Sequence, residues 1–326
     1  MLYYPITIGD RELPRKATRF GWGEGMVELG RRNPNVVVLG ADLTSSTTAH
    51  LFKNEFPDRF ISFGIAEQNM TAAAGGLAIA GKIPFVSTYA VFSSGRSWDQ
   101  LRTTVCYSNL NVKIGGAHGG VSVGPDGATH QGLEDLAITR CIPNLTVLSP
   151  CDYIEAKKAT IAGGELVGPV YIRFGREPMP IITDEETPFR IGEANMYRDG
   201  KDCTIIATGH MVHRALVAAE RLEKEGLSVR VVDLHTIKPI DKEAIVQCCE
   251  ETGCLVTAEE HQLHGGMSSA VAEVVVENCP VPVEMVGIRD RFGESGDPEK
   301  LMDHFGLGIE HVMDAVRRAI ARKKRS

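Results

Sequence analysis

A single carboxylate, Glu67, precedes a segment built largely from alanine and glycine, residues 71–81. If this segment is helical, its small side chains let a neighbouring element pack closely and remove water from the carboxyl group. Loss of water favours the protonated, hydrogen-bonding form of a carboxyl group. Glu67 is therefore a candidate acid or base. The alternative is an ordinary acidic residue in a first helical turn, where it complements the helix dipole.

A glycine-rich segment, residues 115–130, carries the next group of reactive side chains. Its glycines permit unusual dihedral angles and a close approach of the backbone to a ligand. His118, Asp126 and His130 can form hydrogen bonds near neutral pH. This combination predicts a loop that binds a polar ligand.

Further candidates follow expected strands, where open α/β sheets usually place ligands. The loop after residues 36–39 contains Asp42 and Ser46. Tyr89 and Phe92 follow residues 83–87; they could offer aromatic faces to a flat ring or belong to the core. Arg173 leaves the last strand and could bind a phosphate or form a surface ion pair.

The elements that must position these residues alternate along the chain. Short β-branched runs alternate with longer helical patterns, which predicts parallel βαβ units covered on both faces. In the first part of the chain we expect strands at 36–39, 83–87, 112–114, 145–148 and 170–174, and helices at 23–32, 67–80, 94–105, 130–140 and 152–162.

A second α/β unit follows a stretch rich in Pro, Glu, Asp and Gly, residues 176–200. Here we expect strands at 204–207, 229–232, 254–257 and 283–286, and helices at 210–225, 241–251, 266–277, 298–305 and 309–323. The predicted fold class is α/β with two doubly wound domains. The predicted division is a first domain at 1–185, a linker at 186–200 and a second domain at 201–326.

Composition narrows the functional classes. The chain has 326 residues, of which 43% are hydrophobic and 24% charged, as in a globular protein large enough for two domains. Its net charge of -7 argues against a general nucleic-acid binder. No apolar run approaches the ~20 residues that cross a bilayer, so we expect no membrane association. The start of the sequence lacks signal-peptide features, which favours the cytoplasm.

Cysteine spacing gives no sign of a metal site. The eight cysteines form no CxxC pair, and Cys248 and Cys249 are adjacent, a poor arrangement for a shared tetrahedral metal. We expect reduced thiols and no metal ligands in this chain. The segment 259–266 contains two histidines and two glutamates, but we interpret it as a strand end leading into a glycine-rich helix entrance.

Several motifs in order resemble the pyrimidine-binding and C-terminal domains of the transketolase family, whose members depend on thiamine diphosphate. The resemblance covers essentially the whole chain. The motifs that carry it are Ala17-Thr18-Arg19, Gly40-Ala41-Asp42-Leu43-Thr44, Gly64-Ile65-Ala66-Glu67-Gln68 and Gly124-Pro125-Asp126-Gly127-Ala128-Thr129-His130-Gln131.

The resemblance implies roles around the cofactor. Glu67 matches the glutamate that bonds a ring nitrogen of the aminopyrimidine and promotes the imino tautomer, which takes the proton from the thiazolium carbon. The cofactor carries the carbanion chemistry, and protein groups tune it. Phe92 matches the aromatic residue that stacks on the pyrimidine, and Tyr89 matches a second family aromatic. Asp42 matches an acidic residue near the cofactor and the subunit contact.

The resemblance also implies a sugar phosphate site. Asp126 and His130 match residues that bond substrate hydroxyl groups, and His130 is also expected to take part in catalysis. Four further residues match the family's sugar phosphate pocket, where cations and a hydroxyl group suit a dianion. They are Arg19, Ser46, His118 and Arg173.

The family's diphosphate-binding domain, with its Gly-Asp-Gly metal motif, has no match in the sequence. The resemblance therefore implies the C-terminal subunit of a split transketolase. An N-terminal partner subunit would supply the diphosphate site and Mg²⁺, and a heterotetramer is expected. The second domain's expected task is assembly.

Other members of the superfamily remain alternatives. Ala66 and Gln68 stand where many full-length transketolases have Arg and His, and Gly-Ile-Ala-Glu-Gln also occurs in deoxyxylulose-phosphate synthases. The segment Arg173-Phe174-Gly175-Arg176 is closer to transketolase. The beta subunits of 2-oxoacid dehydrogenases match the loop from His118 to His130 less well. A non-catalytic assembly subunit is the alternative from another class.

Overall fold

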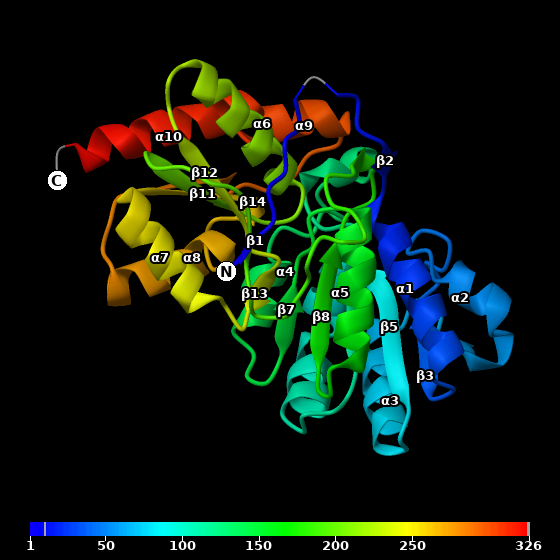
Figure 1. The fold of residues 1–326 in the computed structure, drawn as a ribbon. Coiled ribbons are helices and arrows are strands. Elements are labelled where there is room, and N and C mark those ends of the chain that lie inside the picture. The colour runs from blue at the N-terminus through cyan, green and yellow to red at the C-terminus, as the bar shows by residue number, and fades with distance from the viewer. Residues whose placement is uncertain (10, 325–326) are drawn as a thin grey trace.

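The computed structural model describes residues 1–9 and 11–324, which form two α/β units that lie side by side (Figure 1). The first unit is built on a seven-stranded sheet of order β13-β7-β8-β6-β5-β3-β4. Its strands are β3 (Val36–Gly40), β4 (Phe60–Ser62), β5 (Ile83–Tyr89), β6 (Lys113–Ala117), β7 (Thr146–Leu148), β8 (Val170–Phe174) and β13 (Thr236–Lys238). All of its neighbouring strands are parallel except the pair of β13 with β7.

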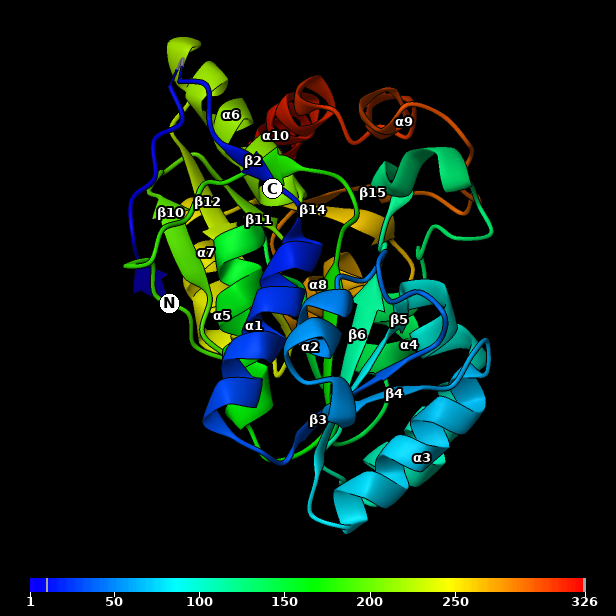
Figure 2. The same ribbon diagram turned by 90° about the vertical axis from the view of Figure 1, so that its right-hand side faces the viewer.

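Helices cover both faces of this sheet because successive side chains of a strand point to opposite faces. Val36 and Val38 of β3 belong to the core beneath α1 and α5, whereas Val37 and Leu39 belong to the core on the α3 face. Figure 2 shows α1 and α5 side by side on one face and α3 at the other side. The helical elements are α1 (Thr18–Arg32), α2 (His50–Glu55), α3 (Glu67–Ile79), α4 (Asp135–Arg140) and α5 (Tyr153–Glu165), with the short turns η1 (Pro57–Arg59) and η4 (Val121–Asp126).

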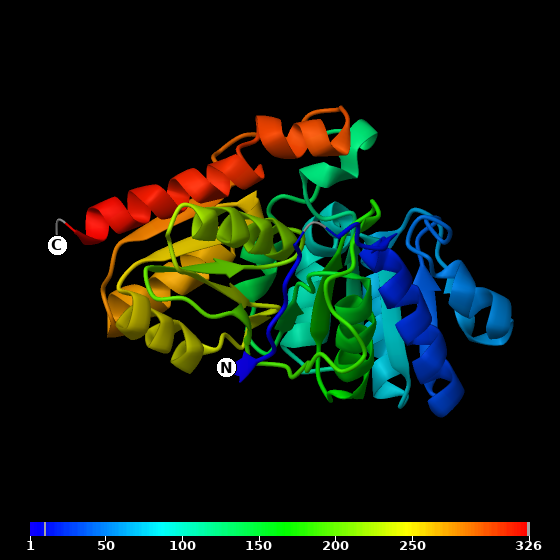
Figure 3. The same ribbon diagram turned by 45° about the horizontal axis from the view of Figure 1, so that its top comes forward.

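The second unit contains a six-stranded sheet of order β1-β10-β12-β11-β14-β15. Helices α6 and α10 lie on one face, and α7 and α8 lie on the other (Figures 1 and 3). The strands are β1 (Leu2–Tyr3), β10 (Asn195–Arg198), β11 (Cys203–Ala207), β12 (Val229–Asp233), β14 (Leu255–Gln262) and β15 (Val283–Ile288). The helices are α6 (Met211–Lys224), α7 (Lys242–Thr252), α8 (Met267–Asn278), α9 (Pro298–His304) and α10 (Ile309–Lys323).

The two units exchange strands, so more than a linker joins them. The N-terminal strand β1 pairs with β10 of the second sheet, and β13, from the second half of the sequence, pairs with β7 of the first. A further two-stranded ribbon pairs β2 (Arg15–Lys16) with β9 (Met179–Pro180). The segment proposed as a linker, residues 186–200, contributes β10 to the second sheet.

The predicted α/β class with two doubly wound domains is confirmed, with local differences. The expected helix at 94–105 is two π-helical segments, η2 (Val91–Arg96) and η3 (Gln100–Cys106). The helix expected at 130–140 begins only at Asp135, and residues 127–134 are not helical. The short elements α2 and β4 were not predicted. Within the described residues, the helices are too short or too polar to span a bilayer.

Candidate active site

Glu67 is the first residue of α3 and is 1% exposed. The helix can lie close to η3 because its small residues leave room: a Cβ added to Gly75 would lie 2.7 Å from Thr104 Cγ2. The expected burial of this carboxylate is therefore observed. The sequence had not indicated its partner, Arg96, whose Nη1 donates to Glu67 Oε2 over 2.8 Å.

Two aromatic rings lie next to this ion pair. Tyr89 ends β5, and Phe92 lies in the π-helical segment η2. Their rings are stacked, with centroids 5.9 Å apart and planes 17° apart. The Arg96 guanidinium lies 4.4 Å from the centroid of Phe92, so one cation contacts both Phe92 and Glu67. π-Helical segments of this kind are frequent at functional sites.

Both predicted histidines of the glycine-rich loop reach these rings. The His118 ring centroid lies 3.9 Å from that of Tyr89, and the rings of His130 and Phe92 form a T-shaped pair with centroids 5.6 Å apart. His130 Nδ1 is also 2.8 Å from Thr129 Oγ1. The structure therefore brings Tyr89, Phe92, His118 and His130 into one group.

His118 is held as a neutral imidazole. It is 1% exposed, its backbone has a left-handed φ of 60°, and its Nδ1 is buried without a hydrogen-bond partner. Burial, together with the nearby charges of Arg19, Arg176 and His130, lowers its pKa to about 3. A neutral imidazole can donate one hydrogen bond and accept another, which suits recognition of a hydroxyl group.

Two arginines lie close enough to His118 to lower its pKa. Arg19 Nη1 donates to the Ser46 carbonyl oxygen over 3.0 Å, whereas Arg19 Nε is buried without a partner. Arg176 Nη1 donates to Asp126 Oδ1 over 3.0 Å and to the Val123 carbonyl over 3.0 Å. Paired guanidinium groups suit a dianion such as a phosphate.

Arg176 was not among the predicted site residues, although it ends the segment 173–176 that pointed to transketolase. Arg173, which was predicted instead, lies beneath the loop. Its Nε donates to the Asp135 carboxylate over 3.0 Å, and its Nη2 donates to the carbonyls of Gly132 and Glu260 over 2.9 and 2.8 Å. These contacts favour a supporting role for Arg173 rather than a contact with phosphate.

Asp42 is separate from the group around Glu67. It lies in the loop after β3, is exposed and has a left-handed φ of 59°. In the described part of the chain, no hydrogen bond or ion pair connects it with Glu67, Phe92 or His130. An exposed acid at this edge is available to a second chain, so its predicted role at a subunit contact stays a prediction.

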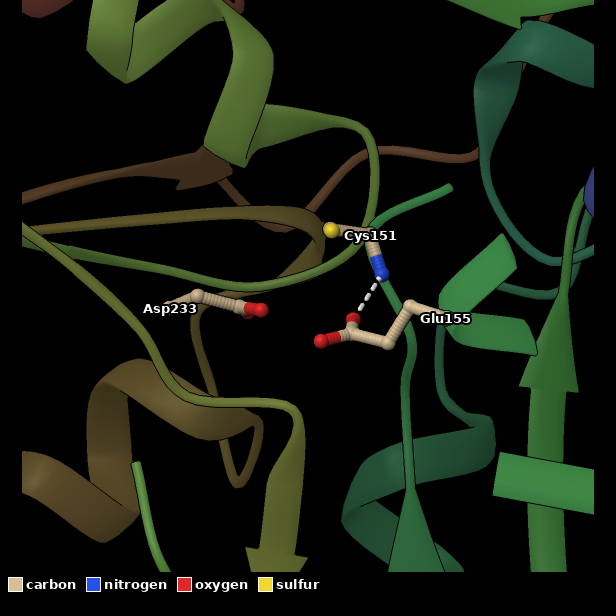
Figure 4. Close-up of side chains that lie close together, drawn as sticks. All are labelled: Cys151, Glu155 and Asp233. Atoms are coloured by element: carbon tan, nitrogen blue, oxygen red, sulfur yellow. Dashed lines mark hydrogen bonds between the residues drawn. The ribbon is translucent and has the colours of Figure 1, made fainter. Parts of the chain in front are cut away.

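Three buried side chains form the one group in the described residues with metal-ligand character: Cys151, Glu155 and Asp233 (Figure 4). Their ligand atoms lie within 4.8 Å of one another, and the Cys151 N–H donates to Glu155 Oε2 over 2.6 Å. Burial raises the pKa of both the Cys151 thiol and the Asp233 carboxyl group well above their usual values. Metal ligands must be deprotonated. Both Asp233 carboxylate oxygens are buried without a hydrogen-bond partner among the described residues, and the raised pKa of Asp233 favours its protonated form over a metal ligand.

Family models match almost the whole chain. The model described as transketolase, pyrimidine binding domain, matches residues 15–180, and the model described as transketolase, C-terminal domain, matches residues 192–312.

Curated relatives, some of similar length and some about twice as long, carry related names. A "putative transketolase C-terminal section" of Methanocaldococcus jannaschii is 45% identical over 91% of this chain and 94% of that protein. A "6-deoxy-6-sulfo-D-fructose transketolase subunit" of a Clostridium strain is 41% identical over 91% and 92% of the two chains. Rat transketolase is 38% identical over 95% of this chain, which corresponds to 49% of the rat protein.

A solved structure matches over nearly its full length. It is described as a split gene transketolase, inactive beta4 tetramer, with 46% sequence identity, a TM-score of 0.88 and coverage of 94% of this chain and 99% of that chain.

Proposed function

Because the chain belongs to the transketolase family, we propose that it is the C-terminal subunit of a split, thiamine-diphosphate-dependent transketolase. In this proposal it transfers a two-carbon ketol unit from a ketose phosphate to an aldose phosphate. The observation that carries the proposal is the placement of buried Glu67 beside Phe92, with His130 against the same ring and the arginines around His118 nearby.

The group around Glu67 fits the aminopyrimidine of the cofactor. Glu67 offers a carboxylate to a ring nitrogen, and Phe92 and Tyr89 offer aromatic surface to a flat ring. When bound, thiamine diphosphate supplies the carbanion chemistry of the transfer. Arg96 now contacts both Glu67 and Phe92, so it has to give up at least one of these contacts when the ring is received.

The loop residues fit a phosphorylated sugar. In this proposal Asp126 and His130 bond hydroxyl groups of the sugar, and neutral His118 bonds another. Arg19 and Arg176 provide the cations for the phosphate. The side chain of Ser46 is a further candidate, although the contact seen with Arg19 uses its carbonyl.

The proposal requires an N-terminal partner subunit that binds the diphosphate and Mg²⁺. Similarity to a split gene transketolase and to a transketolase C-terminal section supports this requirement. We propose a heterotetramer in the cytoplasm. Asp42, exposed in the loop after β3, is proposed to contact the partner and the cofactor.

Reconstitution tests the proposal. The purified chain, combined with its N-terminal partner, thiamine diphosphate and Mg²⁺, should transfer a two-carbon unit from xylulose-5-phosphate to ribose-5-phosphate. Absence of transfer in a complex shown to have formed would refute it, and would favour the assembly-subunit alternative. Carbon dioxide release from pyruvate would instead indicate a deoxyxylulose-phosphate synthase or 2-oxoacid dehydrogenase activity.

A second substrate class is favoured by one relative, whose name specifies a 6-deoxy-6-sulfo-D-fructose substrate. A sulfonate, like a phosphate, is an anion with oxygens that accept hydrogen bonds from arginine. Parallel assays with phosphorylated and sulfonated ketoses in the reconstituted complex would distinguish the two by their kcat/KM.

A further inference from the structure

The glycine-rich loop is attached to the second unit by a buried carboxylate, Glu260 of β14. Glu260 is 3% exposed, and its Oε1 accepts the backbone N–H of Ser122 over 2.6 Å. Its Oε2 lies 3.2 Å from His210 Nδ1, and the same nitrogen lies 3.3 Å from Ser122 Oγ. The two residues of the second unit therefore hold one short segment of the loop.

The glycines of the loop show how closely the carboxylate approaches. Gly120 has a φ of +101°, and a Cβ added there would lie 2.1 Å from Glu260 Oε1. Any larger side chain at this position would displace the carboxylate. The Glu260 carbonyl also accepts Arg173 Nη2 over 2.8 Å, and Arg173 Nη2 donates to the carbonyl of Gly132, just after the loop. Glu260 thus contacts Ser122 within the loop directly and Gly132 through Arg173.

The groups around Glu260 stabilise the charged form of its carboxylate. Burial acts to raise the pKa of Glu260, but His210, Arg173 and the Ser122 N–H stabilise the carboxylate, so its pKa is lowered overall. Charge-assisted hydrogen bonds of this kind are about twice as strong as neutral ones.

The anchored segment lies between the predicted substrate residues. Ser122 is four residues after His118 and four residues before Asp126, and Asp126 is in turn fixed by Arg176. A second contact across the units, Gln131 Nε2 to the Glu294 carbonyl over 2.9 Å, holds the loop next to His130. A shift of the anchor would therefore move the sugar-binding groups, while Glu67 lies on a separate element, α3.

Building on the proposed function, we infer that Glu260 and His210 are positioning residues of the second unit, which hold the loop of His118, Asp126 and His130 in register for the sugar phosphate. This assigns the second unit a part in substrate recognition besides assembly. Neither residue needs to touch the substrate or the cofactor.

The test compares Glu260→Ala with Glu259→Gln in the reconstituted complex. Glu259 is the adjacent residue of β14 and is equally buried, but its carboxylate accepts the N–H groups of Met267 and Ser268 at the start of α8. Glu260→Ala should raise the KM for both sugar phosphates about tenfold, a change of ~1.4 kcal/mol. Exchange of the cofactor C2 proton, which depends on Glu67, should stay within about twofold of wild type. Glu259→Gln should leave the KM unchanged.

Glu260→Gln keeps an oxygen acceptor for the Ser122 N–H and should restore most of the affinity for the sugar phosphates. This variant also keeps the inference testable if Glu260→Ala fails to fold. Hydrogen exchange of the chain alone gives a readout without activity: residues 119–126 should lose protection in Glu260→Ala and keep it in Glu259→Gln. Unchanged protection and unchanged KM would overturn the inference, as would an equal loss of C2 exchange. A wild-type complex without transfer would refute the proposed function, whereas the hydrogen-exchange comparison would still decide the role of Glu260.

Discussion

Arg96 Nη1 lies 2.8 Å from Glu67 Oε2, and the same guanidinium lies 4.4 Å from the centroid of Phe92. These are the two groups that the proposed function assigns to the aminopyrimidine ring. Glu67 is 1% exposed and the Arg96 side chain is 45% exposed, so the cation can leave toward solvent while the carboxylate cannot. In the free subunit, Arg96 thus satisfies a buried anion that the cofactor is proposed to contact.

Arg96→Ala should destabilise the free subunit because it leaves the Glu67 carboxylate buried and unpaired. We expect a loss of about 1 to 2 kcal/mol in the free energy of unfolding, less than for a fully buried pair because Arg96 is half exposed. Urea denaturation measures it, with the exposed Arg102 of the neighbouring segment, changed to Ala, as the control. In the cofactor-loaded complex the loss should shrink. An equal effect of both variants would contradict this account.

Replacing Arg176 and replacing Arg173 should have different effects. Arg176→Ala should raise the KM for phosphorylated substrates about tenfold or more with little effect on folding, because it removes a charged hydrogen-bond donor from the proposed phosphate site. Arg173→Ala should instead destabilise the fold by roughly 3 to 5 kcal/mol, since it leaves Asp135 buried without its cation. Steady-state kinetics and thermal unfolding check both. If only Arg173→Ala raised the KM, the prediction from the sequence that Arg173 binds the phosphate would stand.

His118 should remain neutral across the physiological range in the free subunit, because burial first, and then Arg19, Arg176 and His130, lower its pKa to about 3. The unfolded chain takes up a proton below about pH 6.5, so this residue reduces stability as the pH falls through that value. A phosphate dianion bound between the arginines should raise the pKa of His118. NMR titration of the imidazole, with and without inorganic phosphate, measures this; titration near pH 6.5 in the free subunit would contradict it.

Asp233→Asn should remove a pH dependence of stability. Burial, and next the charge of Glu155, raise the pKa of Asp233 well above 3.8, so the folded state keeps a proton that the unfolded state loses. Wild-type stability therefore falls as the pH rises from 3.8 toward the raised pKa, by at most ~1.4 kcal/mol per pH unit. As the pH rises through that range, the free energy of unfolding of Asp233→Asn, measured by urea denaturation, should increase relative to that of wild type. The exposed carboxylate Asp199, whose pKa is lowered by Arg230, provides a control. Asp199→Asn should show no such increase in the free energy of unfolding relative to wild type. A constant difference between Asp233→Asn and wild type would argue against a raised pKa of Asp233.

The sequence predicted most strands and helices because the pattern of apolar residues is local: Val36 to Leu39 read as a strand buried on both faces, and they form β3. It predicted Glu67, Phe92, His118 and His130 as members of one site through motifs, and the structure brings these together. It could not reveal the Arg96 partner of Glu67, since an arginine in a helical segment has no distinguishing pattern. It also missed contacts between distant segments, such as Ser122 with Glu260 and the strand β13 in the first sheet, because these depend on how the two units pack.

The most direct test compares wild type and Glu67→Gln in complexes reconstituted with the N-terminal partner, thiamine diphosphate and Mg²⁺. Exchange of the cofactor C2 proton with deuterium, followed by NMR after rapid quenching, reports whether Glu67 acts on the ring. We predict rapid exchange and ketol transfer in the wild-type complex, and exchange slowed by at least about 100-fold in Glu67→Gln, within the range of general acid-base effects. An assembled Glu67→Gln complex that exchanges and transfers at the wild-type rate would contradict the account.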